Sequence, residues 1–349
     1  MNENFSAVIQ ASEDDRRGLF LTAVARLGTA VQNVEKDFWV CWALDALFNG
    51  LQADGPRLLF KGGTSLSKSY GLISRFSEDI DITVFREDIG EPTEASELDA
   101  LSGKQRRIRL ERIRTACQQY IADSMATQLG AVAANAIPNG RFRLGLDPDD
   151  EDQQTLLFWY PAVTANPDDY IRSAVKIEAG AKSALDPNEA TAITPYVSDD
   201  LSDLDMTVRN VTTVKPERTF WDKIVILHGL RQWHDRRSLL RQGGQRVSRH
   251  YYDVYRLLQH PDAAAWMYDR SLALDCARHA RLFFGSADLR LEVAAHGSFT
   301  LTPSDVMRDA LARDYDAMSG MIFEPPPPID DVFQAIADLE QHLNTDSTN

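Results

Sequence analysis

The sequence is poor in the residues that build disulfide frameworks and zinc sites. It has three cysteines, Cys41, Cys117 and Cys276, which lie far apart and form no C-x-x-C pair. Its seven histidines form neither an H-x-x-x-H nor an H-E-x-x-H pattern. We therefore expect buried, reduced thiols and no zinc site, as is typical of a cytoplasmic protein.

Long apolar runs and a secretory leader are also missing. No run approaches the roughly 18 apolar residues that a membrane-spanning helix needs. Residues 1–17 contain no basic segment followed by an apolar one, so we expect neither secretion nor a membrane partner, and a cytoplasmic location. With 349 residues, 44% of them hydrophobic, the chain can bury the core of one large or two ordinary domains.

Positive charge is scarce overall. The net charge of −15 disfavours a nucleic-acid binder whose charge is evenly spread. The basic residues, however, cluster in two blocks. Residues 104–114 hold six Lys or Arg against one acid, and residues 215–260 hold ten Lys or Arg against four acids. A solvated helix face explains either block; phosphate binding beside an active site is the alternative, which we favour for the second.

Residues 61–84, KGGTSLSKSYGLISRFSEDIDITV, contain the most distinctive pattern of the chain. Polar and apolar residues alternate strictly from Asp79 to Val84, which predicts a strand with Asp79 and Asp81 on one face and Ile80 in the core. Two carboxylates on one face are poor core residues. They are good ligands for Mg²⁺, which prefers hard oxygen donors and completes its shell with water and phosphate.

The glycines that precede this strand suit an anionic ligand. Gly62 and Gly63 let the backbone approach a ligand closely. A short helix that begins at Thr64 and Ser65 would direct backbone N–H groups towards a phosphate. Together with the paired aspartates, this turn predicts a site for a metal-bound nucleoside triphosphate.

Periodicity and turn residues predict the remaining elements. We expect helices over residues 16–27, 34–48 and 97–125, helices beginning at residues 216 and 249, and mostly helix over 263–342; strands are expected over 58–61, 141–146, 155–160 and 170–179. Residues 180–214 show little periodicity and are a candidate domain boundary. Residues 231–249 read as a loop, and 344–349 as a disordered tail. The charges of residues 35–37 are expected to complement a helix dipole.

Four stretches resemble known proteins. KGGTSLSK (61–68) and RFSEDIDI (75–82) resemble the AbiEii/AbiGii toxin family of bacterial abortive-infection and toxin–antitoxin systems, within the nucleotidyltransferases of the DNA polymerase β superfamily. The gap from Gly63 to Asp79 is longer than the superfamily's usual spacing, so the longer toxin-family form carries the resemblance. ERTFWDKIVIL (217–227) resembles the family element whose helical lysine, here Lys223, reaches the nucleotide phosphates. The R-x-x-Y-D sequence ending at Asp253 resembles a third element with an active-site aspartate.

The resemblance implies an α/β (α+β) fold: a polymerase-β-like nucleotidyltransferase core, with a mixed sheet flanked by helices, and a mainly helical C-terminal domain. We place the N-terminal helices and the core at residues 1–214. The helical domain is expected at residues 215–349, where it would contribute Lys223 and Asp253 to the cleft.

The resemblance also implies the roles of individual residues. Asp79 and Asp81, with Glu178 as a third carboxylate, would bind Mg²⁺ or Mn²⁺. An exposed pair of Lys176 and Glu178 on a sheet face is the alternative for Glu178. The residues expected to bind the nucleotide are Lys61, Gly62, Gly63, Thr64, Ser65, Ser77 and Lys223.

The catalytic residues would be Asp79, Asp81, Lys223 and Asp253. Lys223 would stabilise the charge on the leaving pyrophosphate; the alternative is a lysine that extends its ammonium to water from the edge of a packing face. Asp253 would orient Lys223 or act as general base. Its alternative is a simple ion pair with Arg249 or Arg256 at helical spacing.

These roles predict transfer of a nucleoside monophosphate from an NTP to an acceptor hydroxyl. The resemblance implies a toxin whose acceptor is RNA, at the 3′ end of tRNA, and a cognate antitoxin encoded nearby. Transfer to a protein hydroxyl is a second enzymatic possibility. A catalytically inactive regulator that binds nucleotide or RNA is a third; such a protein would be expected to lose an aspartate or the lysine, and none is missing.

Overall fold

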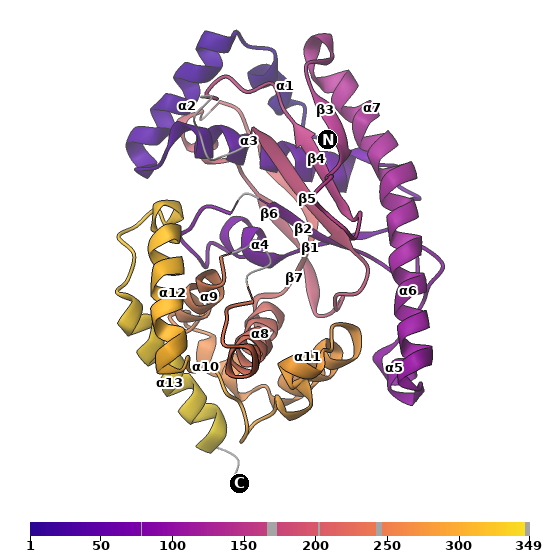
Figure 1. Cartoon of the computed structure of the whole chain (residues 1–349). Helices are drawn as coiled ribbons and strands as arrows, with labels where there is room; N and C mark the ends of the chain where they lie inside the picture. The colour runs from indigo at the N-terminus through magenta and orange to yellow at the C-terminus, as the bar shows by residue number, and fades with distance from the viewer. Residues whose placement is uncertain (78, 166–172, 202, 242–245, 346–349) are drawn as a thin grey trace. The chain divides into compact units, whose positions relative to one another are not determined.

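A computed structural model describes residues 1–77, 79–165, 173–201, 203–241 and 246–345 (Figure 1). The chain divides into two compact units. The N-terminal unit comprises Met1–Tyr70, Phe76–Thr93 and Ser102–Val214, and the C-terminal unit comprises Gly71–Arg75, Glu94–Leu101 and Lys215–Asn349. Each unit is therefore built from more than one segment of the chain.

A mixed sheet forms the centre of the N-terminal unit (Figure 1). Among the described residues, seven strands lie in the order β3-β4-β5-β2-β1-β7-β6. They are β1 (Leu58–Lys61), β2 (Asp79–Val84), β3 (Arg143–Leu146), β4 (Thr155–Trp159), β5 (Ala174–Gly180), β6 (Asn188–Ile193) and β7 (Val208–Val214). β2 pairs with β1 in antiparallel and with β5 in parallel orientation. This sheet and its helices confirm the predicted fold class. Residues 170–172 of the strand predicted over 170–179 lie outside the described residues.

The helices of this unit are α1 (Asn4–Ile9), α2 (Glu13–Leu27), α3 (Val31–Asp45), α4 (Gly62–Lys68), α6 (Gly103–Gln119) and α7 (Ala126–Ala136), with π-helical turns η1 (Ala46–Gly50) and η2 (Tyr120–Met125) and 3-10 turns η3 (Pro138–Gly140) and η4 (Tyr196–Asp200). The helix predicted over residues 97–125 is divided. Ser102 starts a new helix there, because its side chain and that of Gln105 form a capping box.

Helix α3 covers one face of the sheet and leaves the carboxylates on the other. Trp42 of α3 stacks on Phe158 of β4, with 5.1 Å between the ring centroids. The register across β4, β5 and β2 places Ile80 on the same face as Phe158. Asp79 and Asp81 alternate with Ile80 along β2, so they point away from α3.

Residues 180–214 contain two strands where the sequence predicts little regular structure. β6 and β7 form an antiparallel pair with an irregularity between Thr191 and Ile193, and β7 also pairs with β1. β6 lies at the edge of the sheet, and most of its residues are partly or fully exposed. The apolar alternation that reveals a strand in a sequence is therefore weak here.

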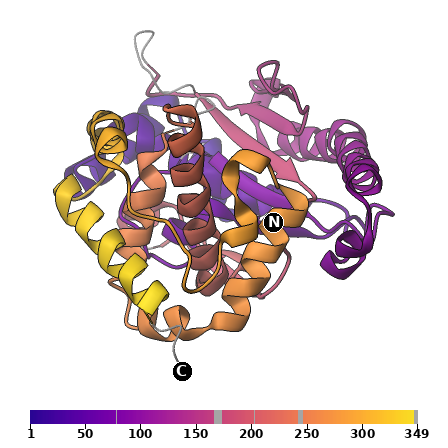
Figure 2. The same ribbon diagram turned by 60° about the horizontal axis from the view of Figure 1, so that its bottom comes forward.

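The described part of the C-terminal unit is helical. It contains α5 (Ala95–Ala100), α8 (Pro216–Arg237), α9 (Ser248–Leu257), α10 (Ala263–Tyr268), α11 (Arg270–Phe283), α12 (Asp305–Met318) and α13 (Ile329–Thr345), with 3-10 turns η5 (Ala287–Leu289), η6 (Leu291–Val293) and η7 (Ser319–Met321). α8 packs against α9 and α11, and α9 packs against α12 and α13 (Figure 2). Within the described ranges, no helix is both long and apolar enough to span a bilayer.

Two predictions for this unit need correction. α8 continues to Arg237, so the loop predicted from residue 231 begins later. The two glycines of the predicted loop, at positions 243 and 244, lie outside the described residues. α13 extends to Thr345, so the first two residues of the predicted disordered tail are helical. The last four residues of that tail are likewise outside the described residues.

Candidate functional site

The pairing of β2 with β5 brings the predicted carboxylates onto one face. In this parallel pair, Asp81 is opposite Glu178 and Asp79 is opposite Lys176. Directly opposed residues of neighbouring strands point to the same face. The side chains of Asp81 and Glu178 are 27% and 28% exposed, so a ligand can reach them. Carboxylate oxygens are hard donors of the kind that Mg²⁺ prefers.

Two lysines lie beside these carboxylates. Lys61 Nζ is 3.8 Å from Asp81 Oδ1, and Lys176 Nζ donates to Glu178 Oε1 at 2.6 Å. Burial opposes the charged form of Lys176, but the hydrogen bond and charge of Glu178 outweigh it and raise the pKa of this lysine. The ion pair of Lys176 and Glu178, which the sequence offered as the alternative to a metal-binding Glu178, is formed.

The metal assignment of Asp79, Asp81 and Glu178 stays a prediction. Among the described residues, no three His, Cys, Asp or Glu side chains are gathered closely enough to hold an ion. The three carboxylates share a face, but Glu178 is turned to Lys176. A metal that used all three would require Glu178 to part from the ammonium.

The glycine turn is packed directly against the paired aspartates. β1 ends at Lys61, and Gly62 follows with a φ of +82°. A Cβ atom at Gly62 would lie 2.1 Å from Asp81 Oδ2. The close approach and the positive φ both require glycine at this position. The structure thus brings together the two halves of the motif, the turn and the aspartates, that are separated in the sequence.

The hydroxyls of the predicted nucleotide-binding residues Thr64, Ser65 and Ser77 form hydrogen bonds within the turn or to the start of β2. Thr64 and Ser65 are fully buried. The Thr64 hydroxyl bonds to the Ser77 hydroxyl at 2.8 Å and to the backbone carbonyl of Asp79, and the Ser65 hydroxyl donates to the carbonyl of Gly62 at 2.9 Å. These bonds fix α4 to the start of β2. Any phosphate binding by these residues would therefore come from backbone N–H groups.

In the C-terminal unit, α8 and α9 bring Lys223 and Asp253 together. Lys223 Nζ donates to Asp253 Oδ2 at 2.8 Å. Arg75 binds the same carboxylate in a bidentate manner, with its Nε and Nη2 at 2.8 Å from Oδ1 and Oδ2. The Lys223 side chain is only 7% exposed, so it does not extend into water. Sequence reasoning missed Arg75, although it is the first residue of RFSEDIDI.

The charges around Asp253 fix its ionisation. Burial alone would raise the pKa of this carboxyl, but the positive charges of Arg75 and Lys223 outweigh it and hold the pKa well below its usual value. Burial lowers the pKa of Lys223, and Asp253 only partly offsets this effect. Both oxygens of Asp253 are already engaged. This arrangement favours the orientation of Lys223 over proton abstraction as the role of Asp253.

Arginines in the second half of the first basic block form ion pairs within the N-terminal unit. Arg109 and Arg112 pair with Glu91, at 2.9 and 3.0 Å. Arg114 pairs with Glu111 and also with an acidic residue of the β3–β4 connection. These contacts favour a solvated, ion-paired helix face over phosphate binding.

The second block combines basic and aromatic side chains. At the end of α8, the guanidinium carbons of Arg237 and Arg241 lie 5.6 and 5.4 Å from the centroid of the Trp233 ring. Arg237 also pairs with Asp288 at 2.6 Å. Both arginines are exposed. Exposed arginines beside a partly buried aromatic ring also occur on nucleic-acid-binding surfaces.

Charges near the start of α3, expected only to complement the helix dipole, are instead buried. Asp37 pairs with Lys68 of α4 at 2.8 Å, and Lys68 Nζ lies 3.7 Å from the centroid of the Tyr196 ring. Glu35 accepts hydrogen bonds from the backbone N–H groups of Val163 and Thr164. The Asp37–Lys68 pair ties α3 to α4, the helix that begins at the glycine turn, and the Glu35 bonds tie α3 to the segment after β4.

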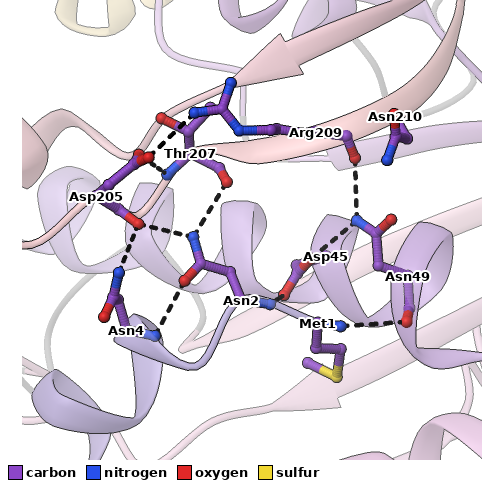
Figure 3. A pocket seen from close by; sticks show the side chains of 9 residues that line it. All are labelled: Met1, Asn2, Asn4, Asp45, Asn49, Asp205, Thr207, Arg209 and Asn210. Carbon is purple, nitrogen blue, oxygen red and sulfur yellow. Dashed lines mark hydrogen bonds and ion pairs between the residues drawn. The ribbon is translucent and has the colours of Figure 1, made fainter.

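A polar pocket of about 370 Å³ opens elsewhere in the N-terminal unit (Figure 3). It is lined by Met1, Asn2, Asn4, Asp45, Asn49, Asp205, Thr207, Arg209 and Asn210. The backbone N–H of Asn2 donates to Asp45 Oδ2 at 2.7 Å, and the Asn2 amide donates to the carbonyls of Asp205 and Thr207. The lining groups mostly satisfy one another, and none is a predicted site residue.

A glycine turn that carries a carboxylate pair in a mixed sheet is the arrangement of a nucleotidyltransferase. The comparison with protein families is more specific: the model of the nucleotidyl transferase AbiEii toxin, of type IV toxin–antitoxin systems, matches residues 45–338. The chain belongs to this family. It is a nucleotidyltransferase toxin, which implies a nucleotide substrate and an antitoxin partner.

Among solved structures, the chain is similar to MenT4, a nucleotidyltransferase toxin from Mycobacterium tuberculosis H37Rv. The TM-score is 0.43 and the sequence identity 16%, over 93% of this chain and 98% of that chain. A search of the curated proteins found no match.

Proposed function

We propose that this protein is a Mg²⁺-dependent enzyme of the cytoplasm that transfers a nucleoside monophosphate from an NTP to RNA, at the 3′ end of tRNA. The family supplies the reaction class. Two observations support the position of the site. Asp81 of β2 lies opposite Glu178 of β5, and the Asp81 carboxylate packs against Gly62.

Asp79 and Asp81, with Glu178, have the donor chemistry for a hard cation. Mg²⁺, or Mn²⁺, held there would neutralise the triphosphate and lower the pKa of the attacking hydroxyl. The chain itself supplies the rest of this half of the site. Lys61 places an ammonium beside Asp81, and the absence of a Cβ at Gly62 lets the backbone of the turn pack directly against the Asp81 carboxylate.

We further propose that Lys223 acts on the same nucleotide. Its ammonium has three donors, of which Asp253 Oδ2 accepts one. Arg75, which binds the other side of Asp253, precedes Asp79 by only four residues in the sequence. Residues 75–79 therefore connect the two groups of residues along the chain. In this scheme Lys223 stabilises the charge on the leaving pyrophosphate, and Asp253 positions Lys223.

RNA as the acceptor is supported by the end of α8. Trp233 has a partly exposed ring, Arg241 is an exposed charge beside it, and Arg237, also exposed, would bind a phosphate in exchange for its pairing with Asp288. The overall charge of −15 means that such a surface must be local.

The test is incubation of the purified protein with Mg²⁺, total cellular RNA and each NTP in turn, labelled on the α-phosphate. We expect label in RNA of tRNA size for wild type and no label for Asp81→Ala. Asp54→Ala, which changes an exposed aspartate outside the site, serves as the matched control and should label as wild type does.

A parallel reaction with total protein in place of RNA distinguishes the acceptors. Label in protein alone would replace RNA by a protein hydroxyl as the acceptor. No label in either material with any NTP would contradict the transfer reaction itself.

A further inference from the structure

Lys176 lies among the carboxylates of the candidate metal site but has no part in the nucleotide chemistry described above. It is opposite Asp79 in the register of β2 and β5, and its Nζ donates to Glu178 Oε1 at 2.6 Å. Its side chain is 34% exposed. The ammonium can therefore leave Glu178 by a change of side-chain rotamer, without repacking of the core.

A divalent ion that used Glu178 would need the carboxylate that now binds this ammonium. Two cations at one carboxylate repel each other, and the repulsion is larger for a divalent ion. We propose that Lys176 competes with the metal for Glu178 and thereby sets the metal affinity of the site. This inference rests on the proposed function, because it assumes that Asp79, Asp81 and Glu178 hold the metal.

The competition has a consequence for nucleotide binding. Once released, the ammonium of Lys176 remains on the same face of the sheet, opposite Asp79. There it can bind an oxygen of the triphosphate. Metal and nucleotide then both favour the state in which Lys176 has left Glu178, so each increases the affinity for the other. Before either binds, the ion pair keeps Glu178 neutralised.

The test is a titration of the full, nucleotide-free chain with Mn²⁺, in which free Mn²⁺ is measured by electron paramagnetic resonance. Lys176→Met keeps the length of the stem and removes the charge. We expect it to bind Mn²⁺ about three- to tenfold more tightly, the effect of one partly exposed charge a few ångströms away. Lys176→Arg, which retains the charge, should bind as wild type does.

Two further variants isolate the effect. Lys104→Met removes an exposed lysine of α6, so it changes the net charge equally and should leave the affinity unchanged. In a Glu178→Gln background, Lys176→Met should no longer tighten binding, because the group for which lysine and metal compete is gone. Circular dichroism on each variant verifies that it is folded.

The outcomes separate this inference from the proposed function. Lys176→Met with wild-type or weaker affinity overturns the inference, as does an equal gain in the Glu178→Gln background. If Asp81→Asn binds Mn²⁺ as wild type does, the metal site is absent, and the proposed metal chemistry fails with it.

Discussion

The carboxylates of the candidate site differ in their surroundings, and the surroundings set what each can do. Asp253 is fully buried between two cations, and both of its oxygens are bound. Asp81 and Glu178 are more than a quarter exposed, and each has one lysine within 4 Å. A buried, fully paired carboxylate is a fixed anion, whereas a partly exposed one can exchange its partner. Asp253 therefore suits positioning, and Asp81 and Glu178 suit ligand binding.

The burial of the Lys223–Asp253 pair predicts that substitution of the lysine and substitution of the aspartate reduce stability to different degrees. In Lys223→Ala, Asp253 keeps its bidentate partner Arg75, so the free energy of unfolding should fall by only about 1–2 kcal/mol. Nucleotidyl transfer should fall by about 10²-fold or more, the scale of losing one preorganised electrostatic contact. Urea denaturation and the labelling assay measure the two effects.

In the companion variant Asp253→Asn, the charges of Arg75 and Lys223 are left buried without a counter-ion, so the free energy of unfolding should fall by about 3–5 kcal/mol. Lys223→Ala that keeps full activity would remove the lysine from the site. A stable but inactive Asp253→Asn would show that Asp253 acts in the chemistry and has little structural weight.

Single-residue roles were only partly predictable from the sequence. The motifs identified Lys223 and Asp253, and the structure brings these two together. Arg75, however, pairs with a residue 178 positions away, and no local pattern reveals such a partner. Thr64 and Ser65 remain predicted nucleotide-binding residues through their backbone N–H groups, but the sequence did not reveal that burial commits their hydroxyls to the turn. Whether a hydroxyl faces a ligand or its own backbone depends on tertiary packing.

Among the elements, the turn between β1 and α4 has the least tolerance for change. Gly62→Ala adds a Cβ that would lie 2.1 Å from Asp81 Oδ2, at a φ of +82°. We expect the Asp81 carboxylate to be displaced and Mn²⁺ binding to be lost, with a destabilisation of about 1–2 kcal/mol from the strained backbone. Mn²⁺ titration and thermal unfolding measure the two effects.

Gly90→Ala provides the matched control for the turn. Gly90 also has a positive φ, of +77°, but a Cβ there would meet nothing within 4 Å. The strain should be similar, and metal binding should survive. If Gly62→Ala and Gly90→Ala lost metal binding equally, the cause would be general destabilisation and not the displacement of Asp81.

Element predictions succeeded where a periodic pattern was strong. The alternation from Asp79 to Val84 gave β2 with its observed bounds, and Pro216 marked the start of α8. The patterns were weak in β6, at the sheet edge, and in residues 97–125, where a capping box divides the helix. The formation of β6 depends on pairing with a strand that is distant in the sequence, and the start of α6 depends on a few capping atoms. Hydrophobic periodicity reveals neither.

At the scale of the whole molecule, the two units are interleaved in the sequence. The C-terminal unit includes Gly71–Arg75 and Glu94–Leu101 from the first third of the chain. The first segment supplies Arg75, the bidentate partner of Asp253. The second forms α5, where Asp99 pairs with Arg278 and Arg281 of α11, at 3.0 and 2.9 Å. A division of the chain at residue 214 therefore cuts through the contacts of this unit.

A fragment of residues 215–349 is accordingly expected to fold poorly by itself. Without Arg75, the buried Asp253 loses its bidentate partner, which costs about 3–5 kcal/mol. Domain stabilities are only about 5–15 kcal/mol, and the ion pairs of Asp99 are lost as well. We expect a broad, poorly cooperative urea transition by circular dichroism. Co-expression with residues 1–214 should restore cooperativity, because it returns both segments. A lone fragment that unfolds as sharply, and at the same urea concentration, as the full chain would show that the interleaved segments contribute little to this unit.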